Sequence, residues 1–95
     1  MNTYYIYILL CSDNSYYIGF TNNLEERVLQ HQNGVNSSSY TYKKRPIHLI
    51  YSEEFIDVKQ AIEREKQLKK WSRAKKEALI NNDLVKLKNL SKSKD

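Results

Sequence analysis

With 95 residues, the chain can form one domain with a small core and has no room for a second. Its composition, 40% hydrophobic and 28% charged, is typical of a soluble globular protein, and no apolar run is long enough to span a membrane. The single cysteine, Cys11, excludes an internal disulfide and a cysteine-rich zinc site. Because no secretory signal is visible either, we expect a cytoplasmic protein.

Positive charge is concentrated in the second part of the chain, although the whole carries only +5, with a pI of about 9.3. Residues 1–58 hold four Lys/Arg against six Asp/Glu, whereas residues 59–95 hold twelve against five. A positive surface of this kind suits phosphate groups. Lysine-rich helices can also simply be solvated, and charge alone does not separate these two interpretations.

The first predicted element is a β-hairpin. Tyr4–Cys11 and Tyr16–Thr21 are rich in β-branched and aromatic residues, and Ser12–Ser15 between them favours a turn. The first strand then has an aliphatic face, which could pack on helices, and a face rich in tyrosine. The tyrosines could offer hydroxyls to a ligand, or they could only stabilise the hairpin through cross-strand pairs. Alternation along the first strand puts Ile6, Ile8 and Leu10 on one face and Tyr5, Tyr7 and Leu9 on the other.

A helix is predicted next, with Asn22 as its N-cap and Glu25 completing a capping box. It should run to about Gln32 and end at Gly34, which can adopt the left-handed conformation. Arg27 and His31 are four residues apart and therefore share one face of this helix.

The remaining elements are a loop, a third strand and two helices. Val35–Pro46 is predicted to be the loop and Ile47–Phe55 the strand. Asp57 can cap a helix that reaches Trp71, and Ser72 can cap another that reaches about Asn82. The order β-β-α-β-α-α predicts an α/β fold with a three-stranded antiparallel sheet flanked by helices. The domain should cover residues 1–82, with residues 83–95 as a basic tail that is loosely ordered beyond Leu90.

Glu65 is the acid whose position is most informative. It lies in the helix stripe of Ala61 and Leu68, which should face the core, whereas Glu63 lies on the solvated face. A carboxylate beside an apolar stripe is costly unless it is paired or binds a metal. Glu65 could therefore extend to the edge of the core, pair with Arg27 or act as a metal ligand.

Several short motifs resemble the GIY-YIG nuclease superfamily, especially its small standalone bacterial members and, more distantly, the structure-selective and UvrC-type endonucleases. The signature appears as Tyr5-Ile6-Tyr7, with tyrosine in place of the usual first glycine, and as Tyr17-Ile18-Gly19. The resemblance extends from Tyr4 to about Ile80. Its further segments are Thr21–Arg27, Gln30–Gly34, Tyr40-Thr41, Arg45-Pro46 and Ala61–Lys70.

The resemblance implies hydrolysis of phosphodiester bonds that depends on Mg²⁺, with Mn²⁺ as a substitute, by an endonuclease of low sequence specificity in DNA repair or processing. It places Glu65 as the metal ligand and Arg27 as the stabiliser of the transition state. Tyr7 is favoured as the general base, its pKa lowered by a nearby cation, with Tyr17 positioning water or substrate; these roles could be reversed. His31 could accept a proton or orient a tyrosine hydroxyl. Gly19 is expected to serve backbone approach at a strand end.

Nucleic acid is the expected partner, DNA rather than RNA, bound by a monomer that contacts no membrane. The alternative function is a non-catalytic nucleic-acid-binding module that retains the fold. Backbone phosphates would be contacted by cations in the loop and the later helices, and two tyrosines could stack on an unpaired base. The cations are Lys43, Lys44, Arg45, Lys69, Lys70 and Arg73, and the tyrosines are Tyr40 and Tyr42.

Overall fold

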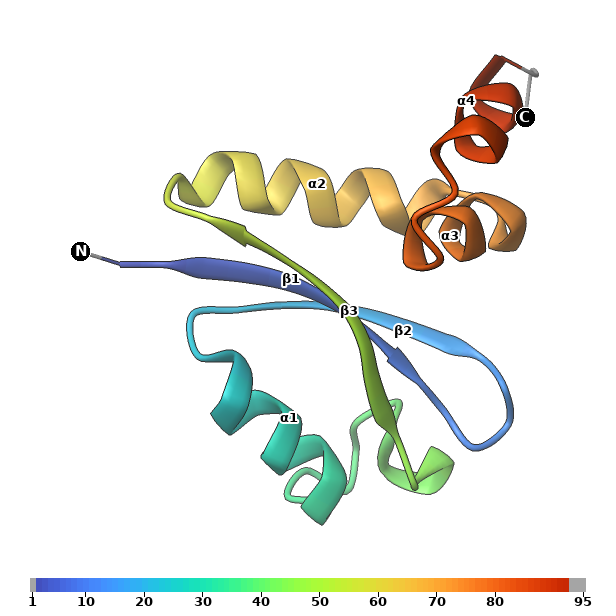
Figure 1. Cartoon of the computed structure of the whole chain (residues 1–95). Helices are drawn as coiled ribbons and strands as arrows, with labels where there is room; N and C mark the ends of the chain where they lie inside the picture. Colours follow the sequence, from blue (N-terminus) through green and yellow to red (C-terminus); the bar gives the residue numbers. More distant parts are fainter. Residues whose placement is uncertain (1, 93–95) are drawn as a thin grey trace.

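An antiparallel sheet with the strand order β2-β1-β3 forms the middle layer of the molecule (Figure 1). Its strands are β1 (Tyr4–Leu10), β2 (Tyr16–Thr21) and β3 (His48–Phe55). The computed structural model describes residues 2–92. Since β1 pairs with both neighbours, β2 and β3 are the two edges of the sheet.

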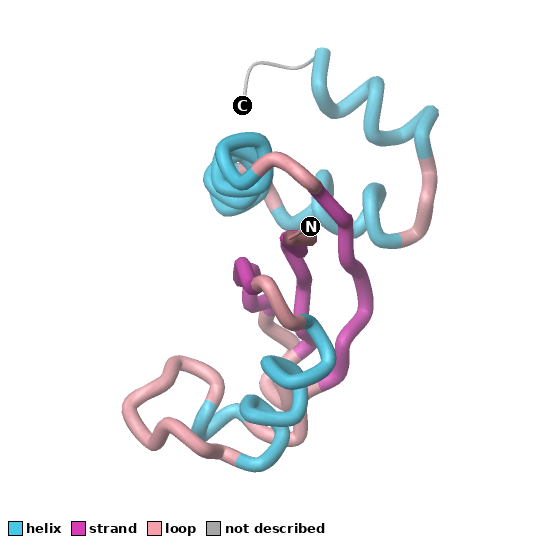
Figure 2. Tube along the Cα trace, turned by 90° about the vertical axis from the view of Figure 1, so that its left-hand side faces the viewer, coloured by secondary structure: helices cyan, strands magenta, loops and turns pink. Residues whose placement is uncertain are grey.

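Helices cover the sheet from both sides, as Figures 1 and 2 show. Helix α1 lies on one face and helix α2 on the other, and this arrangement confirms the predicted α/β fold. The observed order follows the predicted one with two additions, the short 3-10 helix η1 and a final helix α4. The bounds are α1 (Leu24–Asn33), η1 (Tyr42–Lys44), α2 (Val58–Lys70), α3 (Arg73–Ile80) and α4 (Leu84–Lys92).

The central strand β1 is buried on both of its faces, because each face has its own helix. Ile6 and Ile8 pack in one cluster with Leu68 of α2. Tyr7 and Leu9 belong to a second cluster, beside α1. Alternation along the strand therefore separates two small cores, and the predicted tyrosine row is not an open surface, because Tyr7 is 0% exposed.

Helix α1 begins one residue later than the sequence indicated, so the predicted Asn22–Glu25 capping box is wrong. The N-cap is Asn23, whose side chain accepts the Glu26 N–H at 3.1 Å and donates to the Glu26 carboxylate at 3.0 Å. The Thr21 hydroxyl accepts the Asn23 N–H at 3.1 Å and so holds the turn that moves the cap. The helix ends at Gly34 in the left-handed conformation, with φ of 64°, as predicted.

The C-terminal segment is more regular than predicted. Asp83 caps α4 by accepting the Lys86 N–H at 3.1 Å, and the helix continues through Ser91 and Lys92. The loosely ordered tail expected beyond Leu90 is thus helical to Lys92, and its last three positions lie outside the described residues. Within residues 2–92, none of the helices is both long and apolar enough to cross a bilayer.

Candidate active site

Gly19 allows the Tyr7 side chain to cross strand β2. The two residues are direct partners in the β1–β2 ladder, and a Cβ on Gly19 would lie 2.3 Å from both Cζ and Oη of Tyr7. The phenol therefore lies over the edge strand, and its hydroxyl reaches the β2 edge of the sheet. The expectation that Gly19 serves backbone approach at a strand end is wrong, because the close approach comes from a side chain in mid-strand.

His31 of α1 meets the Tyr7 hydroxyl at this edge. Its Nε2 lies 3.0 Å from Tyr7 Oη, and its Nδ1 lies 2.7 Å from Oγ1 of Thr41. Arg27 lies one helical turn earlier on the same face of α1, as the spacing predicted. The imidazole ring of His31 thereby connects one signature tyrosine, Tyr7, with one loop residue, Thr41.

Burial makes Tyr7 a weak acid in this setting. Desolvation, and next the neighbouring Tyr17, raise the pKa of Tyr7 from 10.0 to about 12. Arg27 opposes this shift through its charge and a hydrogen bond, and the Glu65 carboxylate is close enough to raise the pKa further. The expected lowering of the Tyr7 pKa by Arg27 is therefore outweighed, and the phenol is protonated at neutral pH.

His31 is the complementary group, because its environment keeps it neutral. Burial, followed by the charge of Arg27, lowers the pKa of His31 below the ordinary value of 6.5. A neutral imidazole has one nitrogen without a proton, so it can accept a hydrogen bond or a proton from a phenol. The two pKa values diverge, so transfer of the Tyr7 proton to His31 is unfavourable unless Tyr7 takes up a proton from another donor at the same time.

Tyr17 lies beside this pair and opens onto a cavity. Its ring meets His31 edge-on, with centroids 5.3 Å apart, and stacks on Tyr40 at 5.8 Å with an interplanar angle of 22°. A cavity of about 340 Å³ brings Tyr17, Arg27 and His31 to one surface. The rest of its lining is mainly polar: Gln30, Gly34, Val35, Asn36, Ser39, Thr41 and Tyr42.

Glu65 lies on α2, on the other side of the sheet, and is not part of the cavity lining, although its charge acts on Tyr7. The predicted helix phase agrees with the burial, since Ala61 and Leu68 are 0% exposed, the Glu65 side chain is 19% exposed and Glu63 is exposed. The ion-pair partner of Glu65 is Lys69, at 3.3 Å, rather than Arg27. An ion pair four residues apart with an exposed lysine is weak, so the carboxylate can exchange Lys69 for a metal cation.

The donor set around Glu65 fits Mg²⁺ and not a zinc site. Among residues 2–92 there is no group of three or more His, Cys, Asp or Glu that could hold a metal ion. A cation at Glu65 would thus have one protein carboxylate, with water and substrate oxygens as its other ligands. Mg²⁺ accepts such a shell, whereas zinc requires three or four protein ligands.

Two of the predicted phosphate-binding cations in the loop are engaged within the protein. Lys44 Nζ lies 2.6 Å from the Asp13 carboxylate and 4.3 Å from the centroid of the Tyr40 ring. The Tyr40 ring also stacks on Tyr17, although the residue is 51% exposed. Arg45 donates to the Tyr42 carbonyl at 2.9 Å and lies over the Tyr42 ring at 4.7 Å. The ion pair between Lys44 and Asp13 holds the loop against the β1–β2 turn.

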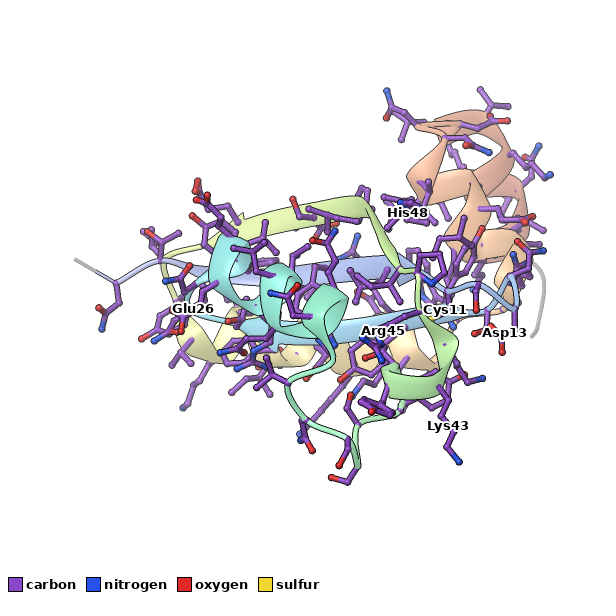
Figure 3. The ribbon with its side chains drawn as sticks, turned by 90° about the horizontal axis from the view of Figure 1, so that it is seen from below. Cys11, Asp13, Glu26, Lys43, Arg45 and His48 are labelled. Carbon is purple, nitrogen blue, oxygen red and sulfur yellow. The ribbon has the colours of Figure 1, made fainter. Side chains whose placement is uncertain are left out.

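Two of the other predicted phosphate-binding cations are also engaged within the protein. Arg73 donates to the Asn14 carbonyl at 2.6 Å, and Lys69 pairs with Glu65. By contrast, Lys43 and Lys70 make no side-chain hydrogen bond or ion pair within the described part of the chain, and both are exposed. Figure 3 shows Lys43 extending from the η1 turn into solvent.

The residue that sequence reasoning missed is Thr41. It is 1% exposed and bonds to His31, whereas the sequence indicated only that it follows Tyr40 in a motif shared with the nuclease superfamily. A threonine between two tyrosines in a polar loop carries no hydropathy signal of burial. Thr41 is buried because it contacts His31 of α1, and local sequence patterns do not show this contact.

The chain belongs to the GIY-YIG family: residues 3–78 match the model of the GIY-YIG catalytic domain. It is similar to a UPF0213 protein from Staphylococcus saprophyticus, 41% identical over 85% of this chain and 98% of the relative. A UPF0213 protein from Clostridium perfringens is 42% identical over 93% of this chain and 94% of the relative.

Two solution NMR structures share this fold. One is a UPF0213 protein from Bacillus halodurans, 34% identical with a TM-score of 0.56 over 83% of each chain. The other is a protein from E. faecalis, 31% identical with a TM-score of 0.61 over 90% of each chain.

Proposed function

We propose that the protein is a Mg²⁺-dependent nuclease that hydrolyses phosphodiester bonds inside nucleic acid strands. The observation that carries this proposal is the hydrogen bond between Tyr7 and His31 at the β2 edge, beside the cationic Arg27. An acid–base pair next to a fixed guanidinium matches the needs of attack by water on a phosphodiester. Glu65 supplies the carboxylate on the opposite side of the sheet edge.

Tyr7 and His31 share the work of the general base. As water attacks, it gives a proton to Tyr7 Oη while Tyr7 passes its own proton to His31 Nε2, so no free phenolate has to form. The water oxygen bonds to phosphorus, the ester bond to the leaving oxygen breaks, and the leaving oxygen takes a proton from solvent. His31 then returns its extra proton to solvent, and the site is restored.

Arg27 and Glu65 handle the charge on the phosphate. The Arg27 guanidinium is permanently charged and can grip two phosphate oxygens in a fork as negative charge develops on them. Glu65 would hold Mg²⁺, which as a Lewis acid supplies stabilisation of the leaving oxygen when it is bound. Tyr17 lines the cavity and positions the water or the substrate.

We expect the protein to bind its substrate through the phosphate backbone of the nucleic acid. Of the predicted phosphate-binding cations, Lys43 and Lys70 make no side-chain hydrogen bond or ion pair within the described residues, so we assign phosphate contacts to them first. Such contacts carry no base information, which is consistent with an endonuclease of low sequence preference. We propose DNA rather than RNA as the substrate, a monomer as the active form and a role in DNA repair or processing.

The test compares Glu65→Gln with Glu63→Gln, two neutralised acids on the same helix. Purified variants are incubated with labelled single-stranded, duplex and branched DNA and with RNA, in Mg²⁺ and in a chelator. We expect Glu65→Gln to lose cleavage while it binds as well as or better than wild type, because a like charge has been removed near the phosphates. Glu63→Gln should behave as wild type, and thermal melts confirm that each variant folds.

Two results would overturn the proposal. If Glu65→Gln cuts as wild type does, this carboxylate does not hold the metal. If wild type cuts no member of the panel in Mg²⁺ but binds nucleic acid with a strong salt dependence, the protein is a binding module that retains the fold.

A further inference from the structure

A chain of hydroxyl groups continues from His31 away from Tyr7. Thr41 Oγ1 lies 2.7 Å from His31 Nδ1 and 3.1 Å from Oγ of Ser39. Ser39 Oγ in turn accepts the backbone N–H of Thr41 at 3.3 Å. Thr41 is 1% exposed, so its hydroxyl cannot substitute bulk water for these partners.

The loop backbone holds Thr41 in place. The Thr41 carbonyl accepts the Lys44 N–H at 3.0 Å, and the Lys44 carbonyl accepts the Ser12 N–H at 2.9 Å next to the end of β1. The ion pair between Lys44 and Asp13 closes the same junction through side chains. Thr41 is therefore fixed to the strand that carries Tyr7, and the imidazole lies between two anchored hydroxyls.

Counting protons assigns the direction of the hydrogen bonds around Tyr7. Arg27, whose charge acts on Tyr7, has only donors and so offers the phenol proton no acceptor. The phenol proton then needs an acceptor, and His31 Nε2 is the one within reach among the described residues. If Nε2 carried a proton itself, the buried Tyr7 O–H would have no acceptor, at a cost of about 1–3 kcal/mol.

The other ring nitrogen follows from this assignment. Since His31 is neutral and its Nε2 is an acceptor, Nδ1 carries the ring proton and donates to Thr41 Oγ1. Thr41 can then donate its own proton to Ser39 Oγ, so every group in the chain has a partner. The alternative tautomer satisfies Thr41 and Ser39 equally well but strands the phenol proton.

We propose that Thr41 is a positioning residue that orients the His31 ring and accepts its Nδ1 proton, and so supports the tautomer, selected by the Tyr7 phenol, in which Nε2 is open to receive the Tyr7 proton. Its catalytic consequence rests on the proposed nuclease function, whereas the tautomer itself does not. Thr41 also accepts the N–H of the imidazolium that forms when the proton arrives, which favours the charged state. Other groups that face His31 are the rings of Tyr7 and Tyr17 and the positive charge of Arg27, which disfavours imidazolium.

The decisive variants are Thr41→Val, which keeps the shape and removes the hydroxyl, and Thr41→Ser, which restores it. Thr21→Val is the matched control, because Thr21 is also buried, at 4% exposed, and its hydroxyl bonds to backbone outside this network. Long-range proton–nitrogen correlation NMR of the nucleic-acid-free protein reports which nitrogen of His31 is protonated. Rate constants for cleavage over a range of pH give the functional readout.

We expect wild type, Thr41→Ser and Thr21→Val to show the Nδ1–H tautomer, and Thr41→Val to show a mixture or the Nε2–H form. Thr41→Val should lower kcat about 10–100-fold, as loss of a partner that orients a functional histidine commonly does, with KM nearly unchanged. The acid limb of its pH profile should move to lower pH, because imidazolium has lost an acceptor, and Thr41→Ser should restore both readouts.

The NMR result separates this proposal from the nuclease proposal. An Nε2–H tautomer in wild type, or an unchanged Nδ1–H tautomer in folded Thr41→Val, would overturn the role of Thr41, whatever the activity. If Thr41→Val does not fold, the wild-type and Thr41→Ser spectra still decide the tautomer. If the tautomers behave as expected and no variant cuts nucleic acid, the positioning stands and the nuclease function fails.

Discussion

Replacing Gly19 with alanine tests whether the Tyr7 phenol must cross strand β2. The new Cβ would lie 2.3 Å from Tyr7 Cζ and Oη, whereas ordinary van der Waals contacts begin at 3.4 Å. The ring therefore has to retreat by roughly 1 Å, and it is fully buried, so its neighbours must move as well. Overpacking of this kind costs about 1–3 kcal/mol, and each kcal/mol should lower the Tm by about 4–8 °C.

The same displacement should impair chemistry more than stability. Tyr7 Oη lies 3.0 Å from His31 Nε2, and a retreat of this size breaks that hydrogen bond. A misplacement of about 1 Å can cost about 100-fold in rate, so Gly19→Ala should cut about 100-fold more slowly than wild type. Affinity for nucleic acid should change little, because the clash is between Gly19 and Tyr7 and not at Lys43 or Lys70, to which the phosphate contacts are assigned.

A double-mutant cycle with Tyr7→Phe identifies the route of the effect. Phenylalanine keeps the ring that clashes and removes the hydroxyl, so Gly19→Ala should still destabilise the Tyr7→Phe protein but slow its cleavage little further. The assays are thermal melts and single-turnover cleavage of one labelled oligonucleotide. If Gly19→Ala leaves Tm and rate unchanged, or if the two rate losses multiply, the crossing does not position the Tyr7 hydroxyl.

Three further predictions follow from charge and protonation. Replacing both Lys43 and Lys70 with glutamine should reduce the slope of log affinity against log salt by about 2. Lys44→Gln should leave this slope nearly unchanged, although it should loosen the loop. Equal slopes for wild type and all variants would refute the assignment of phosphate contacts to Lys43 and Lys70. Cleavage should fall below pH 6.5, at the lowered pKa of His31, because imidazolium cannot accept the Tyr7 proton; a rate that persists unchanged at lower pH would argue against His31 as acceptor. The pKa of Tyr7 is raised from 10.0 to about 12 in the folded state, so its contribution to stability is full below pH 10 and lost between pH 10 and 12; unfolding in denaturant should show this loss in wild type and less of it in Tyr7→Phe.

Local patterns were sufficient to predict most of the fold. Period-two alternation in β1 identified two faces, and Asp57 and Ser72 were recognised as helix caps, as the structure confirms. The misplaced cap of α1 shows where local reading fails, since Asn22 and Asn23 offer the same chemistry. The choice between them is made by the hydroxyl of Thr21 at the end of β2.

Helix α4 was missed for a related reason. Asp83 is an adequate cap, and Leu84, Leu87 and Leu90 recur at helical spacing, but the surrounding Ser and Lys residues suggested a solvated tail. The helix has no buried residue of its own, so a core pattern could not reveal it. Its place depends on packing against α3, which no local signal encodes.

One part of the candidate site could be predicted from the sequence, and the other part could not. The phase of α2, which half-buries Glu65 and exposes Glu63, follows from helical periodicity and could be predicted. The burial of Tyr7 could not, because it requires α1 on that face of the sheet and the absence of a side chain at Gly19 across the ladder. The raised pKa of Tyr7 is a consequence of that packing, whereas the sequence already indicated that His31 could accept a proton.

The most direct test of the central claim is cleavage of labelled nucleic acid by wild type and by Arg27→Ala, each in Mg²⁺ and in a chelator. We expect wild type to cut in Mg²⁺ only, and folded Arg27→Ala to cut more slowly by about 100–1,000-fold, the usual cost of removing one preorganised donor to a developing charge. Cleavage by wild type that persists in the chelator, or an Arg27→Ala protein as fast as wild type, would contradict a metal-dependent phosphodiesterase built on these residues.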